Sequence, residues 1–373
     1  MTQDDLARAA HVSLSMLQKI ERGARAPSDD TFDAIAAALG LDPARLLTDH
    51  HRTESRVHDA MPALSAAIAA YDVPDDGSVR PVHDLHASVA EAVNWRLAAQ
   101  YLRLATQMPG LLADLTRALH AAAPRDRNEV AGLLVSGYRA ADAIAYKFGH
   151  RDLSARLVEL MRWAAAQAGD DLLTATVAYV RTETFFAART HTAGLRALEA
   201  AIDDAPAPGP ARAIAARGAL HMRAAVIAGR ANDAHAAERH LDEARQLGDL
   251  VPEGVYAGTA FGPSSVRIHE VSVAVSLGDA HVQRALDVAR EWEPARDEIP
   301  AERRSGFYIE LARAQLWGGL RDDAFESLKV ARRIAPQHVR EHPWAQQDIA
   351  TLRRLKRSNR EDLTTFAEWL GAF

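Results

Sequence analysis

The chain has 373 residues, a formal net charge of −6, no cysteine, and only 21 glycines and 16 prolines, a composition that favours an all-α fold. The chain is longer than one hydrophobic core can accommodate, because single cores stop growing at about 250 to 300 residues. Its negative net charge is compatible with at most a small DNA-binding domain. The chain lacks cysteine, a signal peptide and any apolar segment of ~18 residues, so we expect a cytoplasmic protein with no disulfides and no membrane partner.

Residues 1 to 48 predict short helices separated by turns. Thr2 is a candidate N-cap of a first helix, and Ser13 caps a second helix in which Leu17 and Ile20 recur before Gly23. Two further short helices follow before residue 48. A short helix, a three-residue turn and a second short helix form the geometry that places the second helix in the major groove of DNA.

These motifs resemble the XRE, or lambda-repressor-like, helix-turn-helix family over residues 2 to 47. The matching motifs are Thr2-Gln-Asp-Asp-Leu-Ala, Val12-Ser13, Ile20-Glu21-Arg22-Gly23, Pro27-Ser28, Leu39-Gly40 and Leu46-Leu47. The resemblance implies a DNA-binding domain over residues 1–48, which would act on double-stranded operator DNA as part of a homodimer.

The resemblance departs from the family pattern at the N-terminus. Family members begin with an additional, usually basic, helix, whereas Met1 is the only residue before Thr2 here, and residues 1 to 48 carry a net charge of −2. We expect that the domain has been shortened at its N-terminus, through a misassigned start or a truncation. Real loss of DNA binding is the alternative.

Residues that point away from the Leu17 and Ile20 stripe are the predicted DNA contacts. The base-contact candidates are Ser13, Leu14, Ser15 and Lys19. Lys19 would donate to guanine, Leu14 would contact a thymine methyl group, and a serine hydroxyl can pair with more than one base edge. The phosphate-contact candidates are Thr2, Gln3, Gln18, Arg22 and Arg25. For Arg22 and Arg25, a solvated surface charge is the alternative.

Residues 49–83 are predicted to form a linker, with a short helix from Met61 to Tyr71 and a turn-rich hinge from Asp72 to Pro81. His83 and His86 could place two imidazoles on one helix face, but no carboxylate of fixed spacing completes a metal site. We expect no metal and no cofactor.

Residues 84–373 show helix after helix at the 3.6-residue period. Small residues at the helix ends fall at 149, 188, 229, 278 and 319, with spacings of 39, 41, 49 and 41 residues. A period near 40 predicts helical hairpins that bury their apolar faces against their neighbours. We therefore predict an all-α protein in which a small helix-turn-helix bundle is followed by a TPR-like α-solenoid that serves sensing and dimerisation.

The segment Phe261-Gly-Pro-Ser-Ser-Val-Arg-Ile-His269 is unusual for a helical repeat. Ser265 and His269 share one helix face, and Arg217 and His221 have the same spacing. Together they suggest a ligand pocket on the inner side of the superhelix; a capped helix in which His269 bonds to a backbone carbonyl is the alternative. The candidate ligand-binding residues are Tyr138, Asp142, Arg181, Arg217, His221, Ser265 and His269.

The combination resembles the helix-turn-helix plus TPR regulators common in actinobacteria, in which an FGP(S/T)NV..H element recurs; Ser265 stands where that element has asparagine. No Walker loop, HExxH motif or nucleophile elbow occurs, so we expect no catalytic residues and no enzyme. The basic run between residues 353 and 360 is most simply a solvated helix face. We predict a transcriptional regulator that senses a small molecule or peptide; the alternative is a repeat-protein adaptor that does not bind DNA.

Overall fold

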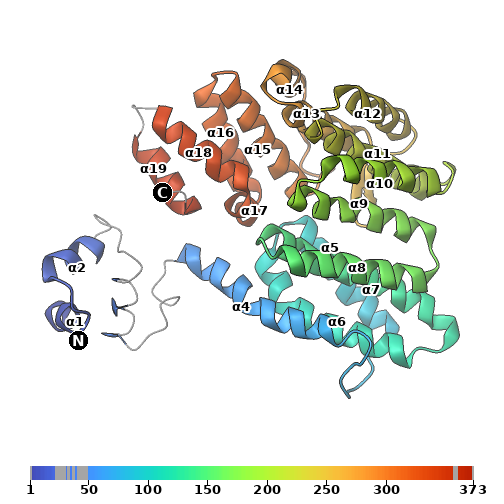
Figure 1. Cartoon of the computed structure of the whole chain (residues 1–373), viewed down its shortest axis with the longest axis horizontal. Helices are drawn as coiled ribbons and strands as arrows, with labels where there is room; N and C mark the ends of the chain where they lie inside the picture. Colours follow the sequence, from blue (N-terminus) through green and yellow to red (C-terminus); the bar gives the residue numbers. More distant parts are fainter. Residues whose placement is uncertain are drawn as a thin grey trace. The chain divides into compact units, whose positions relative to one another are not determined.

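The computed structural model describes residues 2–21, 31, 34–35, 38–39, 49–355 and 360–371. The fold is all-α, as predicted, with 79% of the described residues in helices (Figure 1). The chain divides into two compact units, residues 1–59 and residues 60–373.

The first unit contains helices α1 (Gln3–Ala9) and α2 (Leu14–Glu21). Between them the chain turns through His11, whose φ is 53°. Ala7, Leu17 and Ile35 are buried together in a small apolar core, so the packing stripe of α2 points inward as its spacing predicts. The two short helices and the tight turn between them therefore fix which face of α2 stays exposed.

Helix α4 (Asp49–Ala69) occupies much of the predicted linker and is longer than the helix expected from Met61 to Tyr71. Val57, Met61, Leu64 and Ile68 are buried at helical spacing along one side of α4. This stripe begins before Met61, but the polar residues around Val57 hide it in the sequence.

The second unit is built from helical hairpins that Figure 1 shows side by side in chain order. The hairpins are α5 (Val82–Leu97) with α6 (Tyr101–Ala121), α7 (Pro124–Lys147) with α8 (Arg151–Ala168), α9 (Asp171–Ala188) with α10 (His191–Asp204), α11 (Ala211–Arg230) with α12 (Ala234–Gly248), α13 (Pro263–Leu277) with α14 (Val282–Glu291), and α15 (Ala301–Trp317) with α16 (Arg321–Ile334). The 3-10 turn η2 (Asp279–His281) precedes α14, and α17 (Pro336–Glu341), α18 (Pro343–Leu355) and α19 (Arg360–Leu370) follow α16.

The turns inside the hairpins lie at or within three residues of the small-residue positions that define the sequence period. Each contains a residue with positive φ: Gly149, Arg189, Asn232, Gly278 and Gly319. A left-handed residue lets the chain leave one helix and re-enter the next in a few residues. The α5–α6 hairpin, which turns at Ala99 with a φ of 55°, lies before the predicted series and was missed.

The first helices of the hairpins contact one another in the order α5, α7, α9, α11, α13 and α15, and α15 also contacts α5. Long-range polar contacts hold this closure. The Tyr101 hydroxyl lies 3.3 Å from Oε1 of Glu302, Lys147 Nζ lies 3.0 Å from the same carboxylate, and the backbone N–H of Leu102 donates to Oε1 of Gln337 at 3.1 Å. The first helices therefore surround a common inner surface.

A short antiparallel β-hairpin, β1 (Gly254–Tyr256) and β2 (Thr259–Phe261), interrupts the repeat between α12 and α13. Its two-residue turn has positive φ at both Ala257 and Gly258, 46° and 74°. The ring of Phe261 is fully buried against α11 at Gly218, where a Cβ atom would lie 2.0 Å from the ring. The β-hairpin therefore packs against α11 at a glycine that leaves space for an aromatic ring.

Candidate functional site

The exposed face of α2 carries the candidate base contacts. Leu14, Ser15 and Lys19 are exposed, while Leu17 beneath them is 2% exposed. The Ser13 hydroxyl accepts a hydrogen bond from the backbone N–H of Met16 at 3.2 Å, so its oxygen also caps the helix. The structure thus brings these predicted residues together on one short helix.

The described phosphate-contact candidates lie at the start of α1 and along α2. Thr2 and Asp5 form a capping box, and the hydrogen bonds from Thr2 lower the pKa of the Asp5 carboxyl. The Gln3 amide donates to the Glu21 carboxylate, and the Gln18 amide lies 3.5 Å from Oε1 of Gln3. These contacts join the beginning of α1 to α2. The candidates Arg22 and Arg25 lie outside the described residues.

In the second unit, Ser265 and His269 both belong to the start of α13. The Ser265 hydroxyl donates to the carboxylate of Glu253 at 2.6 Å, and its backbone N–H donates to the same group at 2.8 Å. His269 Nδ1 donates to the backbone carbonyl of Ser265 at 2.8 Å, the contact expected in the alternative interpretation. Burial and the nearby Arg303 lower the pKa of His269 to about 3, so the imidazole is neutral and its Nε2 accepts from Arg303 at 3.3 Å.

The structure separates the remaining ligand-binding candidates from this pair. Arg217 donates to the backbone carbonyl of Ile202 at 2.7 Å, near the end of α10. His221 Nδ1 lies 3.1 Å from Nδ1 of His240 on α12. Arg217 and His221 therefore interact with second helices of the hairpins, whereas His269 interacts with a first helix.

The other three candidates also lie apart from that pair. Tyr138 is 1% exposed, and burial raises its pKa to about 12. Asp142 is also 1% exposed and accepts a hydrogen bond from the Ser154 hydroxyl at 2.6 Å. Burial and the nearby Glu183 carboxylate raise the pKa of Asp142. The Arg181 guanidinium lies 5.4 Å from the centroid of the Phe185 ring on its own helix. Nothing in these contacts gathers the three side chains at one site.

A group of residues that the sequence did not single out converges on Tyr179 of α9; we call it the Tyr179 cluster. Its members are Tyr179, Arg96, Arg139, Arg223 and Arg303. Arg303 donates a hydrogen bond to the Tyr179 hydroxyl, and the Arg223 guanidinium lies 4.3 Å from the centroid of the Tyr179 ring. The four arginines come from α5, α7, α11 and α15, so the cluster requires the closed arrangement of first helices.

The β-hairpin contributes acceptors to the same cluster. Arg139 donates to the backbone carbonyl of Ala257 at 2.8 Å and to the Thr259 hydroxyl at 2.7 Å, and Arg96 donates to the carbonyl of Gly258. Arg96 and Arg139 are each 8% exposed. Neutral carbonyl and hydroxyl oxygens therefore solvate two buried guanidinium groups without neutralising their charge.

The arginines dominate the electrostatics of the cluster. Burial on its own would raise the pKa of Tyr179, but Arg223, Arg303 and Arg139 together lower it to about 8. Glu302, although buried, has a pKa held well below its usual range by Lys147, His338 and Arg96. The cluster thus lies in a positive field strong enough to hold the pKa of a buried tyrosine below its ordinary value.

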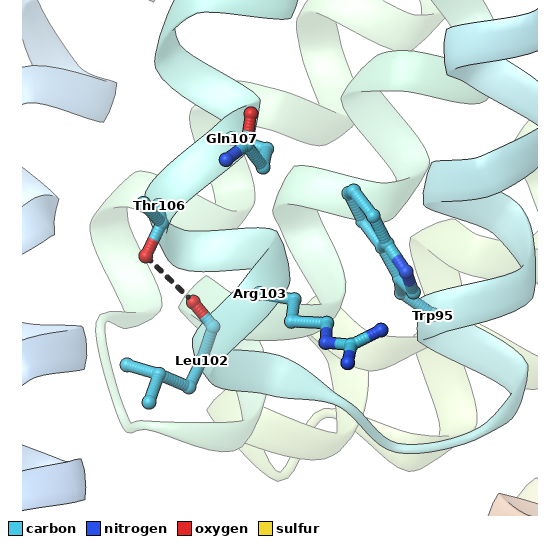
Figure 2. A pocket seen from close by; sticks show the side chains of 5 residues that line it. All are labelled: Trp95, Leu102, Arg103, Thr106 and Gln107. Carbon is cyan, nitrogen blue, oxygen red and sulfur yellow. Dashed lines mark hydrogen bonds between the residues drawn. The ribbon is translucent and has the colours of Figure 1, made fainter.

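A separate surface hollow of about 390 Å³ lies between α5 and α6 (Figure 2). Its lining residues are Trp95, Leu102, Arg103, Thr106 and Gln107. Thr106 is held by a hydrogen bond from its hydroxyl to the Leu102 carbonyl at 2.9 Å. None of the predicted ligand-binding residues lines this hollow.

Within the described part of the chain, no group of three or more histidine and acidic residues is arranged to hold a metal ion. No helix among the described residues combines the length and the apolar character that a membrane span requires.

Comparison with known proteins identifies one domain. A family model described as Helix-turn-helix matches residues 1–46, which contain α1 and α2. This match supports a DNA-binding regulator. Comparisons with curated proteins and with solved structures gave no match.

Proposed function

We propose that this protein is a transcriptional regulator whose helical-repeat unit senses a small molecule or peptide and controls binding of the first unit to operator DNA. The observation that carries the proposal is the exposed face of α2, with Leu14, Ser15 and Lys19, inside the segment that matches the Helix-turn-helix family. In this class of domain the second helix enters the major groove and contacts base edges. The protein would act by binding rather than by catalysis, in the cytoplasm.

The proposed regulator binds DNA as a homodimer. Two copies of α2 would then contact half-sites whose centres lie about 34 Å apart, one helical turn of DNA. An effector that binds one curvature of the repeat unit better than another would change the spacing of the two helices, and DNA affinity with it. The inner surface of the repeats is the proposed effector site.

The test is binding of the full chain to its own promoter DNA, measured by fluorescence anisotropy over a range of salt concentrations. Lys19→Ala should weaken specific binding about 10-fold, because one base contact contributes roughly 1–3 kcal/mol of discrimination. Arg125→Ala is the matched control: it also removes one exposed positive charge, from α7. This variant should bind like the wild type.

Equal losses in Lys19→Ala and Arg125→Ala would show that binding is only electrostatic, and the assignment of α2 as the reading helix would fail. Absence of salt-sensitive binding by the wild-type chain would exclude the regulator and leave the adaptor. Comparing a palindromic site with a single half-site tests the dimer, because a dimer should prefer the palindrome.

A further inference from the structure

We propose that the Tyr179 cluster binds an anionic group, a carboxylate or a phosphate, of the effector that the repeat unit senses. The inference rests on the proposed sensing function and adds the chemical class of the ligand. Arg223, Arg303 and the Tyr179 hydroxyl are the groups that would contact the anion.

The Tyr179 cluster and its neighbours bring together charged groups of both signs. Four guanidinium groups and four carboxyl groups act on one another here, and the carboxyl groups are those of Asp142, Glu183, Glu302 and Glu310. Glu302 forms an ion pair with Lys147, whereas burial raises the pKa values of Asp142 and Glu310, which disfavours their charged forms. Only Arg223 of the four arginines has an ion pair within the described residues, to Glu183 at 3.8 Å. The arginines therefore keep an excess of positive charge.

Burial of this positive charge costs free energy. Isolated buried cations are strongly unfavourable unless they are paired with an anion or fully hydrogen-bonded. Arg96 and Arg139 bond to the β-hairpin, but the buried Nε of Arg223 has no hydrogen-bond partner among the described residues. An anion would supply both the missing acceptor and the missing charge.

The geometry of Arg223, Arg303 and Tyr179 suits an anion. Arg303 is oriented from two sides, by the Nε2 of the neutral His269 and by the hydroxyl of Tyr179, while Arg223 lies over the face of the Tyr179 ring. The side chain of Arg223 is 18% exposed and Arg303 is also partly exposed, so neither arginine is sealed from solvent. Two planar guanidinium groups beside one hydroxyl suit the oxygens of a carboxylate or a phosphate.

This arrangement also gives a role to the Phe261–His269 segment. Its first residue anchors the β-hairpin, whose turn holds Arg139. Its last residue, His269, positions Arg303. The segment therefore supports two arginines of the cluster, Arg139 through the β-hairpin and Arg303 through His269. His269 acts as a positioning residue that would not itself contact the ligand.

The experiment uses Tyr179 as its own reporter in the full chain. Tyrosinate absorbs in the near ultraviolet, and Tyr179 should ionise near pH 8, well before Tyr138 and Tyr146, whose pKa values are raised to about 12. Tyr179→Phe identifies the step by removing it. Inorganic phosphate and acetate are added separately, each against sodium chloride at the same ionic strength.

A bound anion neutralises the arginine field, so the midpoint of the Tyr179 step should rise by about one pH unit in the presence of the anion that binds. A response to phosphate alone assigns a phosphate group, and a response to acetate assigns a carboxylate. Arg303→Gln should abolish the response, and Arg125→Gln, which removes an exposed guanidinium, should preserve it.

A wild-type midpoint that neither anion moves would overturn the proposal, even if the Arg303→Gln variant failed to fold. A response that persists unchanged in folded Arg303→Gln would also overturn it, because the anion would then be bound elsewhere. The readout needs no DNA, so its failure leaves the DNA-binding proposal standing, and loss of DNA binding leaves this titration unchanged.

Discussion

The contact between Gly218 and Phe261 gives a sharp prediction about packing. In Gly218→Ala the new Cβ would lie 2.0, 2.3 and 2.7 Å from three atoms of the Phe261 ring. The ring is 0% exposed and cannot swing into solvent. Overpacking of this kind costs about 1–3 kcal/mol, and the severity of the overlap places it at the upper end. Alanine in place of glycine gains about 1 kcal/mol in a helix, so we expect a net loss of about 2 kcal/mol.

Gly110→Ala is the matched control, because Gly110 also lies inside a helix and its added Cβ would meet no atom within 4 Å. This variant should be more stable than the wild type by about 0.5–1 kcal/mol. Urea unfolding followed by far-ultraviolet circular dichroism should therefore move the two midpoints in opposite directions. Adding Phe261→Leu to Gly218→Ala should recover part of the loss through coupling. Equal or greater stability of Gly218→Ala, or no coupling to Phe261, would refute the reasoning.

Two further predictions concern charge. The side chains of Arg313 and Asp348 are only 12% and 7% exposed, so Asp348→Ala should cost about 3–5 kcal/mol by leaving a buried cation unpaired. Glu159→Ala, which breaks the exposed pair with Arg162, should cost less than about 1 kcal/mol; similar urea midpoints for the two variants would contradict this. Burial, His240 and Arg217 lower the pKa of His221 to about 4, below the ~6.5 of an unfolded chain. Between these two pH values the unfolded state therefore binds more protons than the folded state, so the free energy of unfolding should fall as the pH drops from about 6.5. In His221→Gln this free energy should depend less steeply on pH. The same pH dependence in the variant and the wild type would contradict the prediction.

Most of the helical architecture could be predicted because its causes are local. Left-handed turn residues and apolar stripes at the helical period mark the hairpins in the sequence, as at Gly149 and Gly319. The β-hairpin was missed although Tyr256, Thr259 and Phe261 surround an Ala-Gly turn, because strands of three residues are too short to show a period.

The Tyr179 cluster was missed for a different reason. Its members, with His269, are spaced along the chain by intervals close to the repeat, with 40 residues from Arg139 to Tyr179 and 44 from Tyr179 to Arg223. Each alone resembles an ordinary surface charge of an amphipathic helix. Only the curvature of the stack, which depends on packing between hairpins, brings equivalent positions of several repeats to one place. The unusual sequence of the Phe261–His269 segment was the one sign of this site that the sequence analysis noticed. It did not point to Arg303, because this arginine lies 34 residues beyond His269.

The contact of α15 with α5 makes the second unit a closed arrangement of hairpins rather than an open array. In an open array each repeat touches only its neighbours, so the ends can unfold one hairpin at a time. Here Tyr101 and Glu302, 201 residues apart in the chain, meet across the closure, and Lys147 bonds to the same carboxylate. If the last hairpin unfolded, Tyr101 and Lys147 in the first hairpins would lose their contacts with Glu302. The unit should therefore unfold as one cooperative block, and it should fold more slowly than helical proteins whose contacts are all local.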